Sequence, residues 1–430
     1  MIKIKLTQRE QLLLEIGYFT RLSDWRKTKN KVTLDELMND TTSTISKLLS
    51  WRNELGLERV KNRYKTYHEV YKDKCKYIAS EVFPMKDDLF IRESLLVNPI
   101  YIVHTPYNKI GNGIWKKIKI IVNLIELYNL KFTSDNELLD WLNIEDHYDS
   151  VKEMLRILDG DMAKSYKDCE ETITRRGVTW INKINNELKC IRNFIDEVYD
   201  YKTLFTREIR YDISCLMKIA VCPYCNRQYI TIVNNVEKGT ATFDHFYREA
   251  TYPIFKLSLY NLVPSCYACN SVLKGTDDKE HLNPWFMEKE EVEFDVEFYK
   301  DEEHFLKSFY FGYGNSRYTE AKIEVKNARA GDISTDNSID VFALKDVYEV
   351  HTQYAAKFAV KAQKYERGKY KQMLIDKLND AGFLVDEEMM DRMMYGFPSN
   401  VIGTDAESEY AMSMPLYKLK RDLVKKNRGI

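Results

Sequence analysis

Two Cys-x-x-Cys pairs carry the clearest chemistry in this chain. The first pair is Cys222 and Cys225, and the second is Cys266 and Cys269. Each pair places two thiolates on one side of a tight turn, and two such turns complete the tetrahedral four-sulfur shell that Zn²⁺ prefers. Four thiolates leave no open coordination position, so the predicted zinc is structural. A redox dithiol needs only one such pair, and the presence of two favours the metal.

Polar residues suited to phosphodiester hydrolysis lie between and directly after these pairs. Asp244 and His245 are adjacent, Asn261 precedes the second pair, and Asn270 follows it at once. Hydrolysis needs an activated water and charge neutralisation at the phosphate, which a general base and a divalent ion supply together. Asp244 and Asn270 offer oxygen ligands for Mg²⁺ or Mn²⁺, and His245 is the candidate base. Asn261 is expected to hold the histidine loop through hydrogen bonds from its side chain to the backbone.

A solvated turn is the ordinary interpretation of an isolated Asp-His pair. The flanking cysteine pairs and the two asparagines favour a functional interpretation here, with His245, Asn261 and Asn270 as candidate catalytic residues. Neighbours on a regular strand point to opposite faces, so Asp244 and His245 can serve one centre only where the strand ends. Residues 240–243 are predicted to form that strand, with residues 227–233 as its hairpin partner. A short helix is predicted to begin at residues 271–274.

The motifs around these residues extend from the first cysteine pair to a Leu-Asn-Pro sequence. They are Cys222-Pro-Tyr-Cys-Asn-Arg227, Phe243-Asp-His-Phe-Tyr247, the segment from Tyr252 to Cys266, Cys269-Asn-Ser271, Leu273-Lys-Gly275 and Leu282-Asn-Pro284. Together they resemble bacterial HNH endonucleases of the ββα-metal type. They are most similar to the nuclease partners encoded beside an ATPase in antiphage systems such as Septu and certain retrons.

This resemblance implies a role for each candidate residue. His245 would be the general base, Asp244 and Asn270 the metal ligands, Asn261 the loop-orienting residue, and the four cysteines the zinc site. It also implies double-stranded DNA as the substrate, antiviral defence as the setting and a separately encoded ATPase as the partner. One departure is Arg248-Glu-Ala250, which stands where the family would have proline and then a basic residue. That difference concerns the loop over the substrate and leaves the ligands unchanged.

Other interpretations remain open at this point. A zinc-stabilised module would bind nucleic acid or a protein without cutting it. A nuclease of this type would act equally on RNA, because the centre contacts phosphates that both polymers share. His281 is a rival metal ligand, since some related centres end in histidine, but it lies well past the second cysteine pair and is interpreted as an ordinary polar residue. Lys274 could contact a phosphate or could simply be solvated, and the sequence favours neither interpretation.

Composition indicates a soluble, cytoplasmic protein. The chain has 65 basic and 66 acidic residues, so the whole protein has no net positive charge that would attract nucleic acid. Any surface that binds nucleic acid through its charge must therefore be a local basic patch. The best local stretch is Arg59, Lys61, Arg63, Lys65, His68, Lys72, Lys74 and Lys76, for which a solvated helix face is the favoured interpretation. The remaining cysteines, Cys75, Cys169, Cys190 and Cys215, are scattered and are expected to be reduced. Lys119 and Glu126 interrupt the apolar segment 118–130, so neither a membrane span nor an export signal is expected.

The predicted architecture is α+β, a mostly helical chain around a zinc-bound ββα-metal centre. We divide it into a helical region at 1–215, the nuclease module with its zinc site at 216–286, and a mixed strand and helix region at 287–430. Apolar residues recur at helical spacing in segments 12–16, 34–38, 45–57, 118–130, 151–158 and 181–198. Residues 33–56 resemble a helix-turn-helix in outline, although a generic helical hairpin is favoured.

The C-terminal region shows a different pattern. Strands are predicted at 292–299, 305–311 and 321–326, followed by a long helical region at 341–378. A short helix is predicted after Pro415, and its sequence is also similar to the end of the same nuclease family. That helix would either dock a partner or backbone phosphates, or cover the core as an amphipathic terminal helix.

Overall fold

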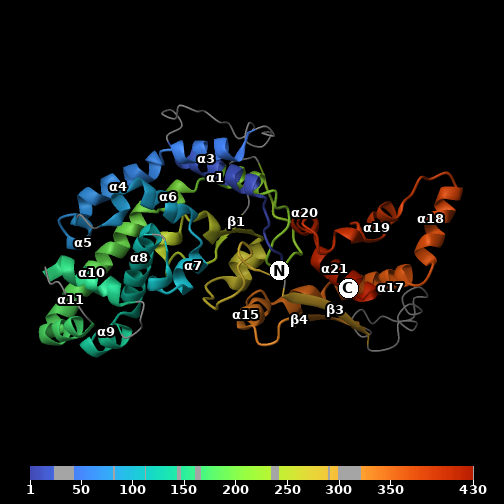
Figure 1. Cartoon of the computed structure of the whole chain (residues 1–430). Coiled ribbons are helices and arrows are strands. Elements are labelled where there is room, and N and C mark those ends of the chain that lie inside the picture. Colours follow the sequence, from blue (N-terminus) through green and yellow to red (C-terminus); the bar gives the residue numbers. More distant parts are fainter. Residues whose placement is uncertain are drawn as a thin grey trace. The chain divides into compact units, whose positions relative to one another are not determined.

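The computed structural model describes residues 1–23, 43–80, 83–111, 113–142, 147–159, 166–233, 242–288, 291–298 and 321–429. The chain divides into two compact units that are interleaved in sequence. The helical unit comprises Leu6–Met217 and Val233–Val263, and the cysteine unit comprises Met1–Lys5, Lys218–Ile232 and Pro264–Ile430. Each unit is described by itself (Figure 1). Residues of the predicted 216–286 module fall in both units, and the three predicted ranges remain a division by sequence.

Helices form most of the helical unit, as the apolar spacing predicted. They are α1 (Gln8–Leu22), α3 (Ile45–Glu54), α4 (Glu58–Tyr71), α5 (Lys76–Ala79), α6 (Asp88–Leu96), α7 (Pro99–His104), α8 (Gly113–Leu130), α9 (Asp135–Leu142), α10 (Tyr148–Asp159), α11 (Tyr166–Val198), α12 (Tyr201–Leu204) and α13 (Arg207–Met217). The long helix α11 packs against α4, α8 and α9, and α1 packs against α3 and α13. Phe194 on α11 is fully buried, and its ring makes edge contacts with Tyr64 and Tyr71 of α4 and with Phe83. Aromatic packing of this kind fixes the helices around one core.

The strand that carries Asp244 and His245 lies in the segment after α13. Among the described residues, β1 (Thr242–His245) pairs with β2 (Leu262–Ser265) in a two-stranded sheet. The prediction that residues 227–233 pair with this strand was wrong, because Tyr229 instead forms an isolated bridge with Val221. The sequence Leu262-Val-Pro-Ser265 gave no clear strand signal, since proline removes a backbone donor and is tolerated only at edges. The strand does end at His245, as the Asp-His pair required.

In the cysteine unit the second sheet packs against C-terminal helices. Strand β3 (Val292–Phe298) runs antiparallel to β4 (Ala321–Asn327), with Val292 opposite Asn327 and Phe298 opposite Ala321. Val292, Phe294 and Val296 are buried and alternate with exposed or half-buried residues, which is the period-2 pattern of a sheet with one covered face. The helices of this unit are α15 (Ile333–Val341), α16 (Leu344–Glu349), α17 (Thr352–Glu366), α18 (Tyr370–Asp380), α19 (Glu387–Tyr395), α20 (Glu407–Ser413) and α21 (Tyr417–Arg428). Both α17 and α21 pack on β3.

The last helix, α21, settles the choice that its sequence left open. Eight consecutive residues of α21, from Tyr417 to Val424, are buried. Lys418 pairs with Asp422 at 3.2 Å, and Arg421 pairs with Glu407 at 2.9 Å. Asp422 also accepts a hydrogen bond of 3.0 Å from the backbone N–H of Phe294 on β3. The helix therefore covers the core, and these basic side chains serve internal ion pairs.

Several sequence predictions fall outside the described residues, in whole or in part. They are the helical segment 34–38 with the first part of the helix-turn-helix outline, residues 33–42, the first half of the strand predicted at 240–243, and the strand predicted at 305–311. Of the helices in the described ranges, none combines the length and the apolar character needed to cross a membrane.

Candidate functional site

The first cysteine pair lies on a knuckle whose two arms are joined by backbone hydrogen bonds. The N–H of Ile230 donates to the carbonyl of Ala220 over 2.8 Å, and the N–H of Cys222 donates to that of Gln228 over 2.9 Å. At the tip, the N–H of Asn226 donates to the carbonyl of Cys222 over 2.7 Å, and Asn226 has a φ of 48°. Asparagine tolerates this left-handed conformation better than most residues, so it suits the position directly after the cysteine pair.

The second pair lies where β2 gives way to a helix. Cys266 follows Ser265 directly, and Cys269 and Asn270 belong to a π-helix at Ala268–Lys274, which begins three residues earlier than predicted. The N–H of Asn270 donates to the carbonyl of Cys266 over 3.0 Å, and the N–H of Cys269 lies 3.5 Å from the Cys266 sulfur. Backbone N–H groups directed at a thiolate stabilise its charge, as they do in metal knuckles.

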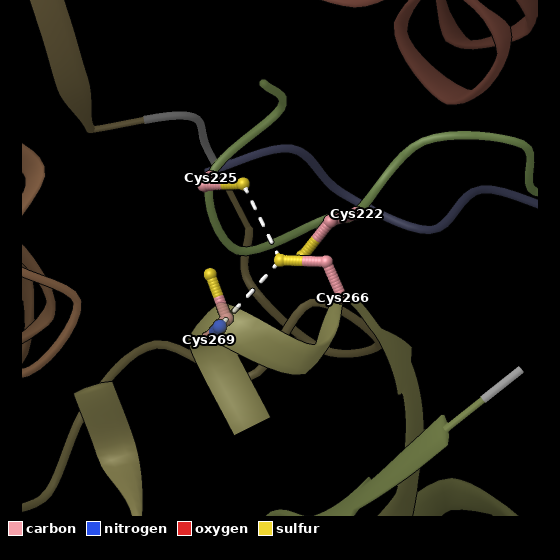
Figure 2. A group of neighbouring side chains, drawn as sticks. All are labelled: Cys222, Cys225, Cys266 and Cys269. Atoms are coloured by element: carbon pink, nitrogen blue, oxygen red, sulfur yellow. Dashed lines mark hydrogen bonds between the residues drawn. The ribbon is translucent and has the colours of Figure 1, made fainter. Parts of the chain in front are cut away.

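The two knuckles bring all four cysteines together in the cysteine unit. Their sulfur atoms lie within 4.8 Å of one another, and all four residues are buried. Figure 2 shows the sulfurs of Cys222 and Cys225, from one loop, directed toward those of Cys266 and Cys269, from the start of the helix. In a tetrahedral zinc site with Zn–S bonds of about 2.3 Å, neighbouring sulfurs are about 3.8 Å apart. The 4.0 Å between the sulfurs of Cys225 and Cys266 fits that spacing and excludes a disulfide between them. Four buried cysteines at this spacing can hold a zinc ion.

Burial and hydrogen bonds among the thiols shift the pKa values of Cys222 and Cys225 in opposite directions. Burial raises the pKa of Cys222 well above its ordinary value. The hydrogen bond from Cys222, followed by those from Cys266 and Cys269, lowers the pKa of Cys225 well below its ordinary value. Without a cation, such a cluster keeps part of its protons because neighbouring thiolates repel one another. A divalent metal removes that repulsion, so metal binding is expected to release protons.

Contacts from the C-terminal helices hold the first knuckle in place. The hydroxyl of Tyr348 on α16 donates to the carbonyl of Cys225 over 2.6 Å. The side-chain oxygen of Asn226 accepts from the N–H of Lys418 at 2.8 Å, and its amide donates to the carbonyl of Ala411 at 3.1 Å. The cysteine cluster is therefore built into the core of its unit.

In the helical unit, His245 is the last residue of β1, and one ring nitrogen and the ring itself contact neighbouring groups. Its Nε2 lies 3.0 Å from the backbone carbonyl of Lys256, and the ring of Tyr201 meets it edge-on with centroids 4.6 Å apart. A carbonyl oxygen can only accept a hydrogen bond, so Nε2 carries the proton in this contact. A neutral imidazole then has its lone pair on Nδ1, which makes Nδ1 the basic atom. Burial raises the pKa of Tyr201, so this neighbour stays a neutral phenol.

Asn261 is fully buried and joins both ends of the loop that follows His245. Its side-chain oxygen accepts from the N–H of Tyr247 at 2.8 Å, and its amide donates to the carbonyls of Tyr247 and Phe255 at 3.0 and 3.1 Å. Its own carbonyl accepts from the N–H of Phe246 at 2.8 Å. These are side-chain to backbone bonds of the kind expected of this residue, while its part in catalysis stays a prediction.

Side chains of helices α8 and α11 form hydrogen bonds and an ion pair with the same loop. Tyr252 donates to Glu126 over 3.0 Å, and Asn129 donates to the carbonyl of Thr251 over 3.0 Å. Asp196 on α11 forms an ion pair with Lys256, the residue whose carbonyl holds His245. The long N-terminal helical region thus supplies the supports of the histidine loop.

The remaining candidates are distributed as follows. Asp244 is buried on β1 in the helical unit, whereas Asn270 lies in the cysteine unit, so their pairing around one metal stays a prediction from the sequence. Lys274 is buried, so the two alternatives left by the sequence, an exposed phosphate contact and a solvated side chain, are both contradicted. His281 is buried against Tyr224 and Phe342, and its Nδ1 lies 2.9 Å from the carbonyl of Lys279. It is not among the residues that group as a metal site in the described part of the chain.

The predicted basic stretch on α4 is partly committed to the helical unit itself. Arg63 donates to the carbonyl of Glu197 over 2.8 Å and lies 3.3 Å from the carboxylate of Asp200. Lys61 pairs with Asp88, and Arg59 donates to the carbonyl of Arg21 over 3.0 Å. Lys65, Lys74 and Lys76 are exposed, so the favoured interpretation of a solvated helix face holds for part of the stretch, whereas contacts within the unit occupy Arg59, Lys61 and Arg63.

Sequence reasoning missed Tyr201 and the Lys256 carbonyl as neighbours of His245. A backbone carbonyl leaves no trace in residue type, and Tyr201 is far from His245 along the chain. It also missed Tyr348, whose contact with the first knuckle arises only in the folded unit. When the chain was compared with protein-family models, with curated proteins and with solved structures, no match was found in any of the three.

Proposed function

We propose that the chain is a metal-dependent endonuclease of the HNH type, with a structural zinc in the four-cysteine cluster and Mg²⁺ or Mn²⁺ as the catalytic ion. The observation that supports this most directly is the setting of His245. The residue ends a strand, its Nε2 is bound to the Lys256 carbonyl, and the basic Nδ1 is thereby oriented. A second support is the four-cysteine cluster, which the motif resemblance expects on either side of this histidine.

The chain's own residues have separate tasks in this proposal. His245 takes a proton from the attacking water at Nδ1, and the Lys256 carbonyl retains the ring in the required tautomer. Asn261 keeps the loop in register with the strand. Asp244 and Asn270 are the proposed oxygen ligands, and the ion would neutralise charge on the phosphate when bound. Double-stranded DNA as substrate, an ATPase partner and a cytoplasmic defence role are proposed from the motif resemblance alone.

Incubation with plasmid and with a single RNA, each with and without Mg²⁺ or Mn²⁺, tests the proposal. Wild-type protein should cut DNA only with the metal, brief EDTA treatment should stop cleavage, and Mg²⁺ or Mn²⁺ alone should restore it while zinc remains bound. Asp244→Ala should lose activity that added Mg²⁺ does not restore. Cleavage of RNA alone would assign an RNA nuclease, and binding of either polymer without cleavage would assign a binding module.

A further inference from the structure

The helical hairpin of α18 and α19 exposes an unusual number of large apolar side chains. In Figure 1 these two helices extend from α17 as a hairpin within the cysteine unit. We call the exposed set the apolar hairpin surface; it consists of Tyr370, Met373, Phe383, Leu384, Met389 and Met393. Leu384 is 94% exposed and Phe383 61% exposed, both in the loop that joins the helices. Clustered exposure of this kind marks an interaction site more often than scattered exposed residues do.

The loop is rigidly built even though its apolar side chains are exposed. The Asn379 side chain accepts from the N–H of Val385 at 2.8 Å and donates to its carbonyl at 3.1 Å. Gly382 has a φ of 89°, which closes α18, and Asp386 caps α19 by accepting from the N–H of Met389 at 2.7 Å. These bonds hold the backbone of the loop that carries Phe383 and Leu384. A preordered anchor loses little entropy when it binds.

A buried polar network fixes the base of the hairpin. Asp391 on α19 is almost fully buried and accepts from Tyr365 on α17 at 3.0 Å and from the backbone N–H of Ser399 at 3.1 Å. Lys371 on α18 reaches the same carboxylate at 2.8 Å. The exposed surface therefore belongs to an anchored element, and its exposure does not come from loose packing.

Exposed acidic residues are frequent along the hairpin that carries the apolar hairpin surface. Between residues 376 and 388 the side chains of Asp376, Asp380, Asp386, Glu387 and Glu388 are exposed, and Lys377 is the single basic residue. Lys371 and Arg392 pair with Glu387 and Glu388. Within the described residues, no cation pairs with Asp376, Asp380 or Asp386. Over residues 369–393 the six acidic residues outnumber the four basic ones, Lys369, Lys371, Lys377 and Arg392, so the hairpin carries a small net negative charge.

We propose that the apolar hairpin surface is a docking site for a basic amphipathic helix of a partner protein. Methionine side chains adapt to different apolar partners, and Met389 and Met393 lie one turn apart on α19. An amphipathic helix places apolar residues at the same spacing and fits such a face. Lysine or arginine on its polar side would face the acidic residues. A symmetric contact between two copies of this chain would instead place acidic residues against one another.

A synthetic amphipathic peptide of leucine and lysine, about five helical turns long, is a direct probe. Its fluorescence anisotropy should report binding to wild-type protein, and a leucine and glutamate peptide with the same apolar face should not bind. The double variant Phe383→Ser/Leu384→Ser should bind the lysine peptide at least about tenfold more weakly, a loss of about 1.4 kcal/mol. Ile333→Ser changes an apolar residue that is 70% exposed on α15, and it should bind like wild type.

A separate variant tests the contribution of the acidic residues to peptide binding. Asp376→Lys/Asp380→Lys leaves the helix cap at Asp386 in place, and it should weaken binding of the lysine peptide and reduce the salt dependence of that binding.

Equal binding of the lysine peptide to wild type and to the serine double variant, with unchanged melting curves, would overturn the proposal. So would equal binding of the glutamate peptide. Self-association in sedimentation that the serine variant abolishes would assign the surface to a second copy instead. The proposal does not rest on the nuclease function, so loss of peptide binding and loss of cleavage are separate results.

Discussion

The four-cysteine cluster and the histidine loop are organised by different forces. The cluster gathers four buried sulfurs from two short knuckles, and a single zinc ion would hold all four. The histidine loop depends on many weaker contacts, among them the Asn261 hydrogen bonds, the Lys256 carbonyl and the Tyr201 ring. The comparison indicates that loss of the metal should affect the fold of one unit, whereas changes in the loop should affect chemistry first.

The largest effect should come from removing the zinc. Purified protein should contain one zinc per chain, and Cys266→Ser or prolonged chelation should unfold the cysteine unit, since structural zinc contributes on the order of 10 kcal/mol to folding. Elemental analysis and circular dichroism measure both. Cys190→Ser, a cysteine outside the cluster, is the matched control and should retain zinc. Active, folded protein without zinc would remove the cluster from its structural role.

The next effect concerns His245. Loss of a general base is typically worth about a hundredfold to ten-thousandfold in rate, so His245→Ala should lower the cleavage rate by that factor. Zinc content and nucleic-acid binding should stay near wild type. The melting temperature should fall only slightly, because the ring is half-buried and gives up a hydrogen bond to the Lys256 carbonyl and its contact with Tyr201. His68→Ala on α4 is the control and should cut normally. A rate for His245→Ala within threefold of wild type would exclude the proposed base.

Asn261→Ala should affect stability and activity together. Removing the side chain leaves the N–H and carbonyl of Tyr247 and the carbonyl of Phe255 without these partners. Each buried group that loses its hydrogen bond costs about 1 to 3 kcal/mol, so the free energy of unfolding should fall by several kcal/mol. Denaturant titration measures it. Asn129→Ala, which removes one more exposed hydrogen bond to the same loop, should cost about 1 kcal/mol or less. Equal losses of stability for both variants would contradict the view that the buried Asn261 side chain holds the two ends of the loop.

The smallest expected effect concerns Lys420, a buried lysine of the cysteine unit, and the free energy of unfolding that its charge costs. Burial lowers the pKa of Lys420 on α21 to about 8. Below that pH the lysine is charged in both states and destabilises the fold. Between pH 8 and the ordinary lysine value of about 10.4 the unfolded state binds more protons, so stability from this group rises with pH. Lys420→Met should therefore be more stable than wild type at pH 7, by on the order of 1 to 3 kcal/mol.

That advantage should shrink as the pH approaches 10, and denaturant titrations of both proteins at pH 7 and pH 10 measure the change. Comparing wild type with the variant cancels other groups that titrate in this range. A difference in stability that stays constant with pH would show that Lys420 does not titrate in the folded protein.

The sequence alone was enough to predict the features that depend on the spacing of residues within a short segment. The Cys-x-x-Cys pairs predicted a four-sulfur cluster because each knuckle is built within a few residues, and the two knuckles have few other ways to satisfy their thiolates. Apolar periodicity located α1, α3, α8, α10, α11 and the helices α16 to α18, and alternation located β3 and β4, because both patterns reflect one buried face of a regular element. The start of α21 after Pro415 followed from the same reasoning.

Tertiary structure decided the contacts whose partners are distant along the chain. Residues 227–233 carried a plausible strand pattern, yet β1 pairs with β2, because register and partner choice depend on long-range packing. The sequence left Lys418 and Arg421 of α21 free to face phosphates, but burial and nearby carboxylates make these two residues internal. The Lys256 carbonyl beside His245 has no signature in residue type at all. The spacing of residues along the chain predicts structures that form within a short segment, such as a helix or a Cys-x-x-Cys turn. The hydrogen-bond partner of a backbone group and the burial of a charged side chain are decided only when distant segments pack together.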